Sequence, residues 1–157
     1  MGYFSVGVHL SLLTGMGIIS APILGYLSDR YGRKQVLVPG LIIAAVLTMF
    51  VVSAGDSVYL ALLLAGIGLF SFALQQIILA ALLDVVRKGT EATASGLIFG
   101  INGLLGFGSP FLAAWIIDDF GGYGSIFYYV GALTLVSAVI IAFIPFPDYR
   151  AAKPARV

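Results

Sequence analysis

The chain has 157 residues, of which 61% are hydrophobic and only 10% are charged. Because soluble domains carry about 25% charged residues and could not bury so much apolar surface in one core of this size, the composition excludes a soluble globular domain and indicates a chain solvated by lipid. The formal net charge of +1 and the absence of cysteine give no basis for nucleic-acid binding, a disulfide framework or a thiolate metal site.

Five apolar stretches, each free of Asp, Glu, Lys and Arg, follow one another along the chain. Each approaches or exceeds the roughly 20 residues that a helix needs to cross about 30 Å of hydrocarbon. None alternates polar and apolar residues as the strands of a membrane barrel do. The sequence therefore predicts an all-α, multi-spanning membrane protein with a transmembrane bundle over 1–147 and a cytoplasmic tail over 148–157. The predicted spans cover about 4–28, 36–55, 57–83, 92–117 and 125–146.

The positive charges lie in three clusters that follow the first, third and fifth spans, and the other two links carry only acidic charges. Because successive spans alternate in direction, all eight Lys and Arg residues fall on one side of the bilayer, which the positive-inside rule assigns to the cytoplasm. We therefore expect a plasma-membrane protein with its N-terminus outside and its C-terminus in the cytoplasm. The clusters are Arg30, Arg33 and Lys34; Arg87 and Lys88; and Arg150, Lys153 and Arg156.

The link after the first span has the sequence GYLSDRYGRK, residues 25–34, which we call the signature loop. Gly25 allows another helix to approach closely, and Gly32 permits a sharp turn because glycine tolerates positive φ. Asp29 is unfavourable at the C-terminus of its own helix but favourable at the N-terminus of a neighbouring helix. Three bases anchor the loop on its side of the bilayer, namely Arg30, Arg33 and Lys34.

The signature loop resembles that of the major facilitator superfamily, G-x-L-[AS]-D-R-x-G-R-[KR], at every defined position. The resemblance implies secondary transport of a small molecule by alternating access, with Asp29 acting as a latch against the other half of the transporter. The implied partners are the lipid bilayer, a missing N-terminal half and an unidentified small-molecule substrate, with no cofactor, metal or nucleic acid. Asp84, at the end of the third span, is a candidate partner for Arg33 or Arg30. The alternative is a pair of solvated charges that contribute little.

The position of the motif relates this chain to one half of the family fold, which has twelve helices in two halves. The motif follows the second helix and is often repeated after the eighth, so the chain resembles helices two to six or eight to twelve. The third span lacks the intramembrane arginine that helix four often carries, and about ten residues follow the last span, which favours the C-terminal half. The complete form of the motif is more typical of the first half. In either case we expect a truncated chain that lacks one helix of its half and is inactive alone.

Polar amides inside the third and fourth spans are the candidate substrate contacts. The resemblance implies that the third span lines the substrate cavity, and this span carries Gln75 and Gln76, while Asn102 lies in the fourth. Amides in a membrane-spanning helix face protein or water. They are therefore candidates for hydrogen bonding a substrate, and the alternative is hydrogen bonding between helices, worth about 0.6 kcal/mol each.

Small residues mark one face of the fourth span. Gly96, Gly100 and Gly103 share a helical face, which suits close helix packing or rocking of the two halves, and Pro110 is expected to bend the outer end of this helix. His9, the only histidine, lies near the outer end of the first span. It is either a proton-sensing group or an interfacial hydrogen-bonding side chain.

Transport is thus the leading hypothesis, and the alternative is a membrane scaffold or assembly subunit that transports nothing. An enzyme is disfavoured, because the sequence contains no HExxH motif and no serine–histidine–acid set. No span contains an acidic residue that could act in catalysis. The signature loop separates the transporter hypothesis from the other two.

Overall fold

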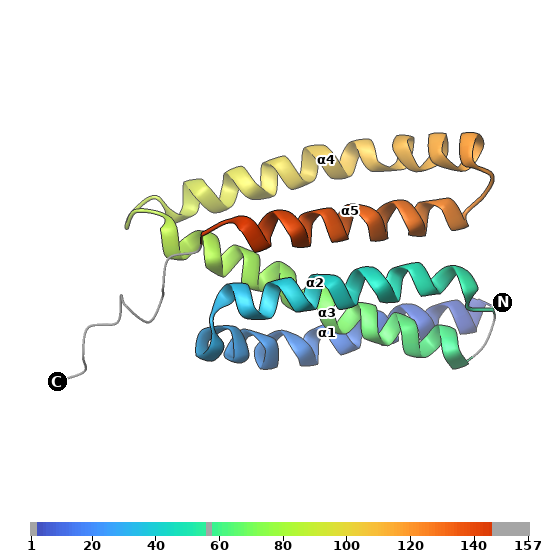
Figure 1. Ribbon diagram of the computed structural model, residues 1–157, viewed down its shortest axis with the longest axis horizontal. Coiled ribbons are helices and arrows are strands. Elements are labelled where there is room, and N and C mark those ends of the chain that lie inside the picture. Colours follow the sequence, from blue (N-terminus) through green and yellow to red (C-terminus); the bar gives the residue numbers. More distant parts are fainter. Residues whose placement is uncertain (1–2, 56–57, 146–157) are drawn as a thin grey trace.

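Five long helices make up most of the chain in the computed structural model, which describes residues 3–55 and 58–145 (Figure 1). All five are long and apolar enough to cross a membrane, and this confirms the expected all-α, multi-spanning fold. The helices are α1 (Tyr3–Tyr31), α2 (Arg33–Phe50), α3 (Val58–Val85), α4 (Glu91–Phe120) and α5 (Gly124–Phe143), with a 3-10 helix η1 (Val51–Ser53) after α2.

The helices extend beyond the stretches that the charges delimit in the sequence. Helix α1 continues to Tyr31 and α2 begins at Arg33, whereas the apolar spans end at 28 and resume at 36. Charges end an apolar stretch without ending the helix, because a helix satisfies its own backbone hydrogen bonds outside the bilayer as well as inside it. The expected end of the fifth span at 146 and the tail over 148–157 lie outside the described residues.

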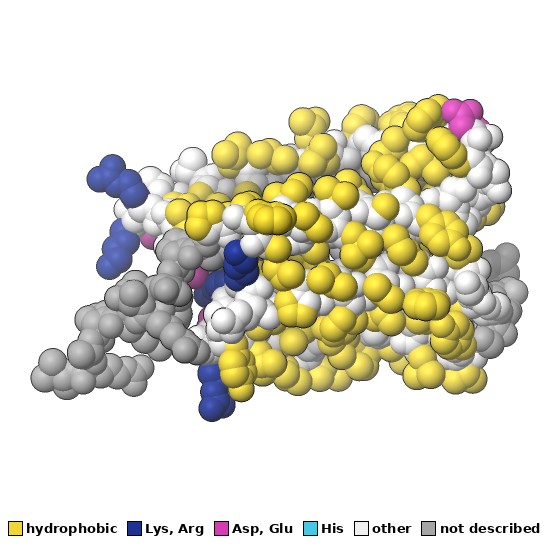
Figure 2. All heavy atoms as spheres, viewed as in Figure 1, with side chains coloured by type: hydrophobic (Ala, Val, Ile, Leu, Met, Phe, Trp, Pro, Cys, Tyr) yellow, Lys and Arg dark blue, Asp and Glu magenta, His cyan; other side chains and the backbone are white. Residues whose placement is uncertain are grey.

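Neighbouring helices run antiparallel, so the loops lie at two opposite ends of the bundle (Figure 1). The α1–α2 and α3–α4 loops share one end, which we call the basic end, because the Lys and Arg side chains visible in Figure 2 gather there. Between the two ends the surface shown in Figure 2 is largely hydrophobic, and many large apolar side chains on all five helices are exposed. Such a belt is the surface that lipid would cover.

Helices α1 and α3 pack most closely, and two glycines make the close approach possible. A Cβ on Gly68 would lie 2.8 Å from the Cα of Leu13 and would also meet the Leu13 carbonyl oxygen. A Cβ on Gly17 would lie 2.7 Å from Phe72 Cγ and would overlap the ring of this side chain. Beside them the buried Ser20 hydroxyl reaches the carbonyl oxygen of Leu69 at 2.5 Å. Small residues therefore bring the two backbones together, as is usual where lipid supplies no hydrophobic force between helices.

The core of the bundle lies between α2 and α3. Leu37 and Ala44 of α2 and Leu74 and Ile77 of α3 form one buried cluster. The side chain of Leu74 fills the space above Gly40, where a Cβ would lie 2.7 Å from Leu74 Cδ2. Helix α2 packs on α5 as well, so it links the α1–α3 pair to the rest of the bundle.

Candidate functional site

The turn of the signature loop depends on Gly32. This residue has φ 113° and ψ 144°, a conformation that is open almost only to glycine. Its amide nitrogen donates to the carbonyl oxygen of Ser28 at 3.0 Å, which satisfies one of the last free carbonyls of α1. The chain then enters α2 directly at Arg33, so the turn places the Arg33 side chain beside the last turn of α1.

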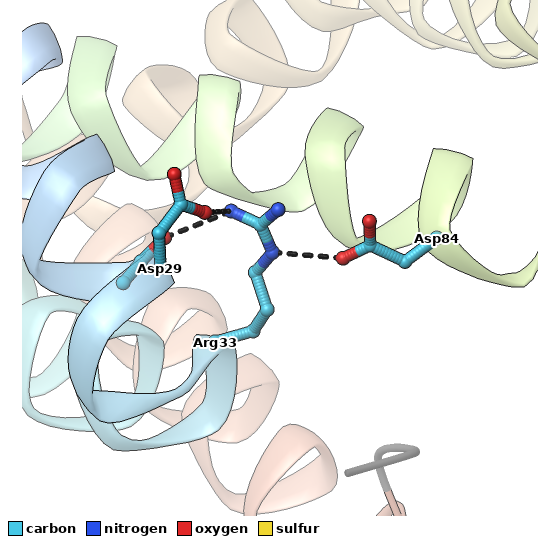
Figure 3. A network of polar contacts seen from close by, with 4 residues as sticks. Asp29, Arg33 and Asp84 are labelled. Atoms are coloured by element: carbon cyan, nitrogen blue, oxygen red, sulfur yellow. Dashed lines mark hydrogen bonds and ion pairs between the residues drawn. The ribbon is translucent and has the colours of Figure 1, made fainter. Parts of the chain in front are cut away.

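Arg33 is the centre of a polar network at the basic end (Figure 3). Its Nη1 atom lies 2.8 Å from Asp29 Oδ1 and donates to Ser28 Oγ at 2.9 Å, while its Nε donates to Asp84 Oδ2 at 2.9 Å. Of the two bases considered as partners for Asp84, Arg33 makes this pair. The network therefore joins the signature loop to the last turn of α3.

Burial decides how much each contact of this network contributes. The Arg33 side chain is 14% exposed and Ser28 is 1% exposed, whereas the carboxylates of Asp84 and Asp29 are 32% and 54% exposed. The link to Asp29 is the most exposed, so solvent screens it most. Such surface ion pairs contribute only about 0–1 kcal/mol to the stability of the fold. The links to Asp84 and Ser28 are partly shielded and hydrogen-bonded, so they fix the arginine more firmly.

Lys34 connects the signature loop to the end of α5. Its Nζ donates to the carbonyl oxygen of Ile144, the C-cap residue of α5, at 3.2 Å. A cation at a helix C-terminus satisfies a free carbonyl and interacts favourably with the helix dipole. The loop thereby contacts the ends of both α3 and α5.

The three candidate amides line one cavity of about 690 Å³, which we call the central cavity and to which all five helices contribute lining residues. Gln75 and Gln76 enter its wall from α3, and Asn102 enters from α4. Phe99 of α4 and Phe127 of α5 also line it. The amides are thus brought together, and their contact with a substrate stays a prediction.

The glycine face of α4 packs against no other helix among the described residues, and its expected use in close helix packing or in rocking of the two halves stays a prediction. A Cβ on Gly96, Gly100 or Gly103 would meet nothing within 4 Å, and the same holds for Gly25 of the signature loop. Ile116 is the only buried residue of α4, all of whose residues are described. Helix α4 lies at one side of the bundle (Figure 1), so part of its surface faces no other helix of the described residues.

Pro110 lies inside α4, which continues through it to Phe120. Proline has no N–H, so the carbonyl oxygen of Gly106, four residues earlier, loses its helical donor. The hydroxyl of Ser109 donates to this oxygen at 2.9 Å and replaces the lost bond. A bend at Pro110 stays a prediction.

His9 makes a local hydrogen bond within α1. Its Nδ1 lies 2.6 Å from the carbonyl oxygen of Ser5, and its Nε2 is buried without a hydrogen-bond partner among the described residues. The hydrogen bond fits the expected hydrogen-bonding histidine. A role as a proton sensor stays a prediction.

Sequence reasoning missed several contacts of the site. The pattern of the loop did not single out Ser28 as the buried partner of Arg33, although a small residue at this motif position was a usable signal. The bond from Lys34 to Ile144 joins residues 110 positions apart and has no local signal. Likewise, nothing in the apolar sequence of the fourth and fifth spans distinguished the cavity-lining Phe99 and Phe127 from lipid-facing rings.

Comparison with known proteins gives consistent matches. Residues 1–156 match the family model of the Major Facilitator Superfamily. An uncharacterized transporter of Buchnera aphidicola is 29% identical over 90% of this chain and 35% of its own length. The bacillibactin exporter of Bacillus subtilis is 35% identical over 60% of this chain and 25% of its own length. The class B tetracycline resistance protein of Escherichia coli is 34% identical over 87% of this chain and 33% of its own length. The chain thus spans about a third of the length of the first and third of these relatives.

Proposed function

Because the chain belongs to the major facilitator superfamily, we propose that it forms part of a secondary transporter that moves a small molecule across a membrane by alternating access. Proteins of this family are transporters and not enzymes, and two of the relatives are described as a transporter and an exporter. The observation that carries the proposal is the Arg33 network, which ties the signature loop to the end of α3. A scaffold protein would not need a partly shielded, charged connection at this place.

The basic end is the cytoplasmic side in this proposal. All five described Lys and Arg residues lie at the adjoining ends of α1 and α2 or between α3 and α4, and the positive-inside rule assigns such an end to the cytoplasm. The N-terminus then lies outside and the chain ends in the cytoplasm, in a plasma membrane. The Arg33 network holds three helix ends together there and supports a cytoplasmic gate that moves as one body. Asp29 belongs to this network, and its side chain, which is more than half exposed, can also dock on another helix.

The central cavity is the proposed substrate site. Gln75, Gln76 and Asn102 offer hydrogen-bond donors and acceptors in a space whose wall is otherwise mostly apolar. Binding sites for small molecules commonly have this composition and a volume of about 300–1,000 Å³. The uncovered glycine face of α4 supports a sliding contact with a further part of the transporter, which would complete the enclosure of the cavity.

We expect the chain alone to show no saturable uptake when reconstituted in liposomes, because five helices leave the cavity and the face of α4 open. Uptake of radiolabelled tetracycline and of bacillibactin would be measured for the chain and for a full-length transporter containing it. The longer protein should give saturable counterflow of at least one compound. Saturable uptake by the chain alone would overturn its proposed inactivity, and no counterflow of either compound by the longer protein would contradict the expected transport of these compounds.

Replacing Asp29 by asparagine in the longer transporter is expected to slow transport about twofold to fivefold, as a carboxylate at a helix N-terminus is worth about 0.3–1 kcal/mol. Insertion into the membrane should not change, because Asp29 lies at a helix end and is 54% exposed. The measurement is the initial rate per inserted molecule. Asp118→Asn, in the last turn of α4 at the opposite end, is the matched control. Equal rates for both variants and the parent would contradict the latch.

A further inference from the structure

The lining of the central cavity contains no Asp, Glu, Lys, Arg or His side chain, and all of its residues are described. Its polar side chains are two threonines, one serine and the three amides. They are Thr48, Ser71, Gln75, Gln76, Asn102 and Thr134. The wall that this chain contributes is therefore electrically neutral, and its chemistry depends on which of these groups are free to bond a ligand.

The hydroxyls of the two threonines already donate hydrogen bonds within their own helices. Thr48 donates to the carbonyl oxygen of Ala44, and Thr134 donates to that of Val130, each at 2.8 Å. The three amides, by contrast, make no hydrogen bond with any described residue. Each amide carries two N–H donors and one carbonyl acceptor, so the wall offers both kinds of partner to a ligand.

Aromatic rings complete the wall. Phe99 comes from α4 and Phe127 from α5, and both line the same cavity. A planar aromatic ligand gains about 0.5–1.5 kcal/mol from each ring contact beyond the area that it buries. A ligand carrying a full charge would give up part of its hydration on this wall and find no opposite charge there to offset the loss, which is unfavourable.

We propose that the central cavity binds an uncharged aromatic molecule, whose rings contact Phe99 and Phe127 and whose polar atoms bond the amides of α3 and α4. This rests on the proposed transport function only in taking the bound molecule to be the substrate. The volume of about 690 Å³ suits a molecule of two or three rings. Gln75, Gln76 and Asn102 then select for hydrogen-bonding groups without selecting for charge.

The test compares two dyes with the same rings and different charge. The full chain in lipid nanodiscs is titrated with N-phenyl-1-naphthylamine, which is neutral, and with 8-anilinonaphthalene-1-sulfonate, which is anionic, and the saturable fluorescence is measured above that of empty nanodiscs. The neutral dye should bind saturably, and the anionic dye should bind at least about tenfold more weakly. Equal affinity of the two dyes, or no saturable binding of the neutral dye, would overturn the proposal.

Two variants locate the binding. Phe99→Ala and Asn102→Leu should each weaken binding of the neutral dye about twofold to tenfold, the equivalent of one ring contact or one hydrogen bond. Phe111→Ala is the matched control, because this ring lies on α4 outside the cavity wall and is 71% exposed. If Phe111→Ala weakens binding as much as Phe99→Ala does, the dye lies on the lipid-facing surface and the proposal is wrong.

The binding assay requires no transport, so the two proposals can fail separately. Counterflow by a longer transporter without binding of the neutral dye would overturn the ligand class and leave the transport function standing. Saturable, cavity-dependent binding without counterflow of any compound would support the ligand class and contradict transport.

Discussion

Substitution of Gly68 by alanine is expected to separate α1 from α3 and to destabilise the bundle by about 1–3 kcal/mol, the usual cost of forcing a group into a filled contact. The added Cβ would lie 2.8 Å from the Cα of Leu13 and against its carbonyl oxygen. Backbone atoms cannot rotate away as the end of a flexible side chain can. The two helices must therefore move apart, which also stretches the bond from Ser20 to Leu69.

The measurement is the thermal unfolding midpoint of the purified chain in detergent, followed by the intensity of the folded peak in size-exclusion chromatography after heating. Gly100→Ala is the matched control, because this glycine is also inside a long apolar helix but faces open space. It should be neutral or stabilising by up to about 1 kcal/mol, the difference in helix propensity. Equal behaviour of the two variants would contradict the account of α1–α3 packing.

The contrast between Gly68 and Gly100 shows which parts of the packing the sequence could predict and which it could not. The number of helices, their approximate positions and the gathering of basic residues at one end follow from the lengths of the apolar stretches and the positions of charges. The spacing of Gly96, Gly100 and Gly103 puts them on one face, which suits helix packing or rocking of the two halves but does not say which neighbour that face meets. The helices that do pack closely use Gly68 and Gly17 instead. Which face meets a neighbour depends on the order of helices in the bundle, and spacing within one helix does not contain this information.

In the candidate site, too, some features could be predicted from the sequence and others depend on how the helices are arranged. The roles of Gly32 at a turn and of Asp84 as a partner acid could be predicted, since both depend on local conformation or on charges that must share one side of the bilayer. The choice of Arg33 over Arg30 could not, because it depends on the direction in which the turn at Gly32 sends the first residue of α2. The shared cavity of Asn102 and the two glutamines likewise required the relative rotation of α3 and α4.

The second large effect is expected at Arg33, where the shielded part of the network can be measured by a double-mutant cycle. Arg33→Gln removes the charge and leaves the carboxylate of Asp84 and the buried hydroxyl of Ser28 without their donor. We expect the free energy of unfolding to fall by about 1.5–3 kcal/mol, the range for hydrogen bonds to charged groups. Arg33→Lys should recover only part of this lost stability, because an ammonium cannot reproduce the fork that contacts Asp29, Ser28 and Asp84.

Coupling between residues distinguishes this network from a set of independent surface charges. The free energy of unfolding is measured for Arg33→Gln, Asp84→Asn and the double variant, and the double variant should be more stable than the sum of the single losses predicts, by about 0.5–3 kcal/mol. The same cycle with Asp29→Asn should give a smaller coupling, because that carboxylate is 54% exposed against 32% for Asp84. Raising the ionic strength should weaken the Asp29 coupling first. Additive losses in both cycles would show that the signature loop is not joined to α3 through Arg33.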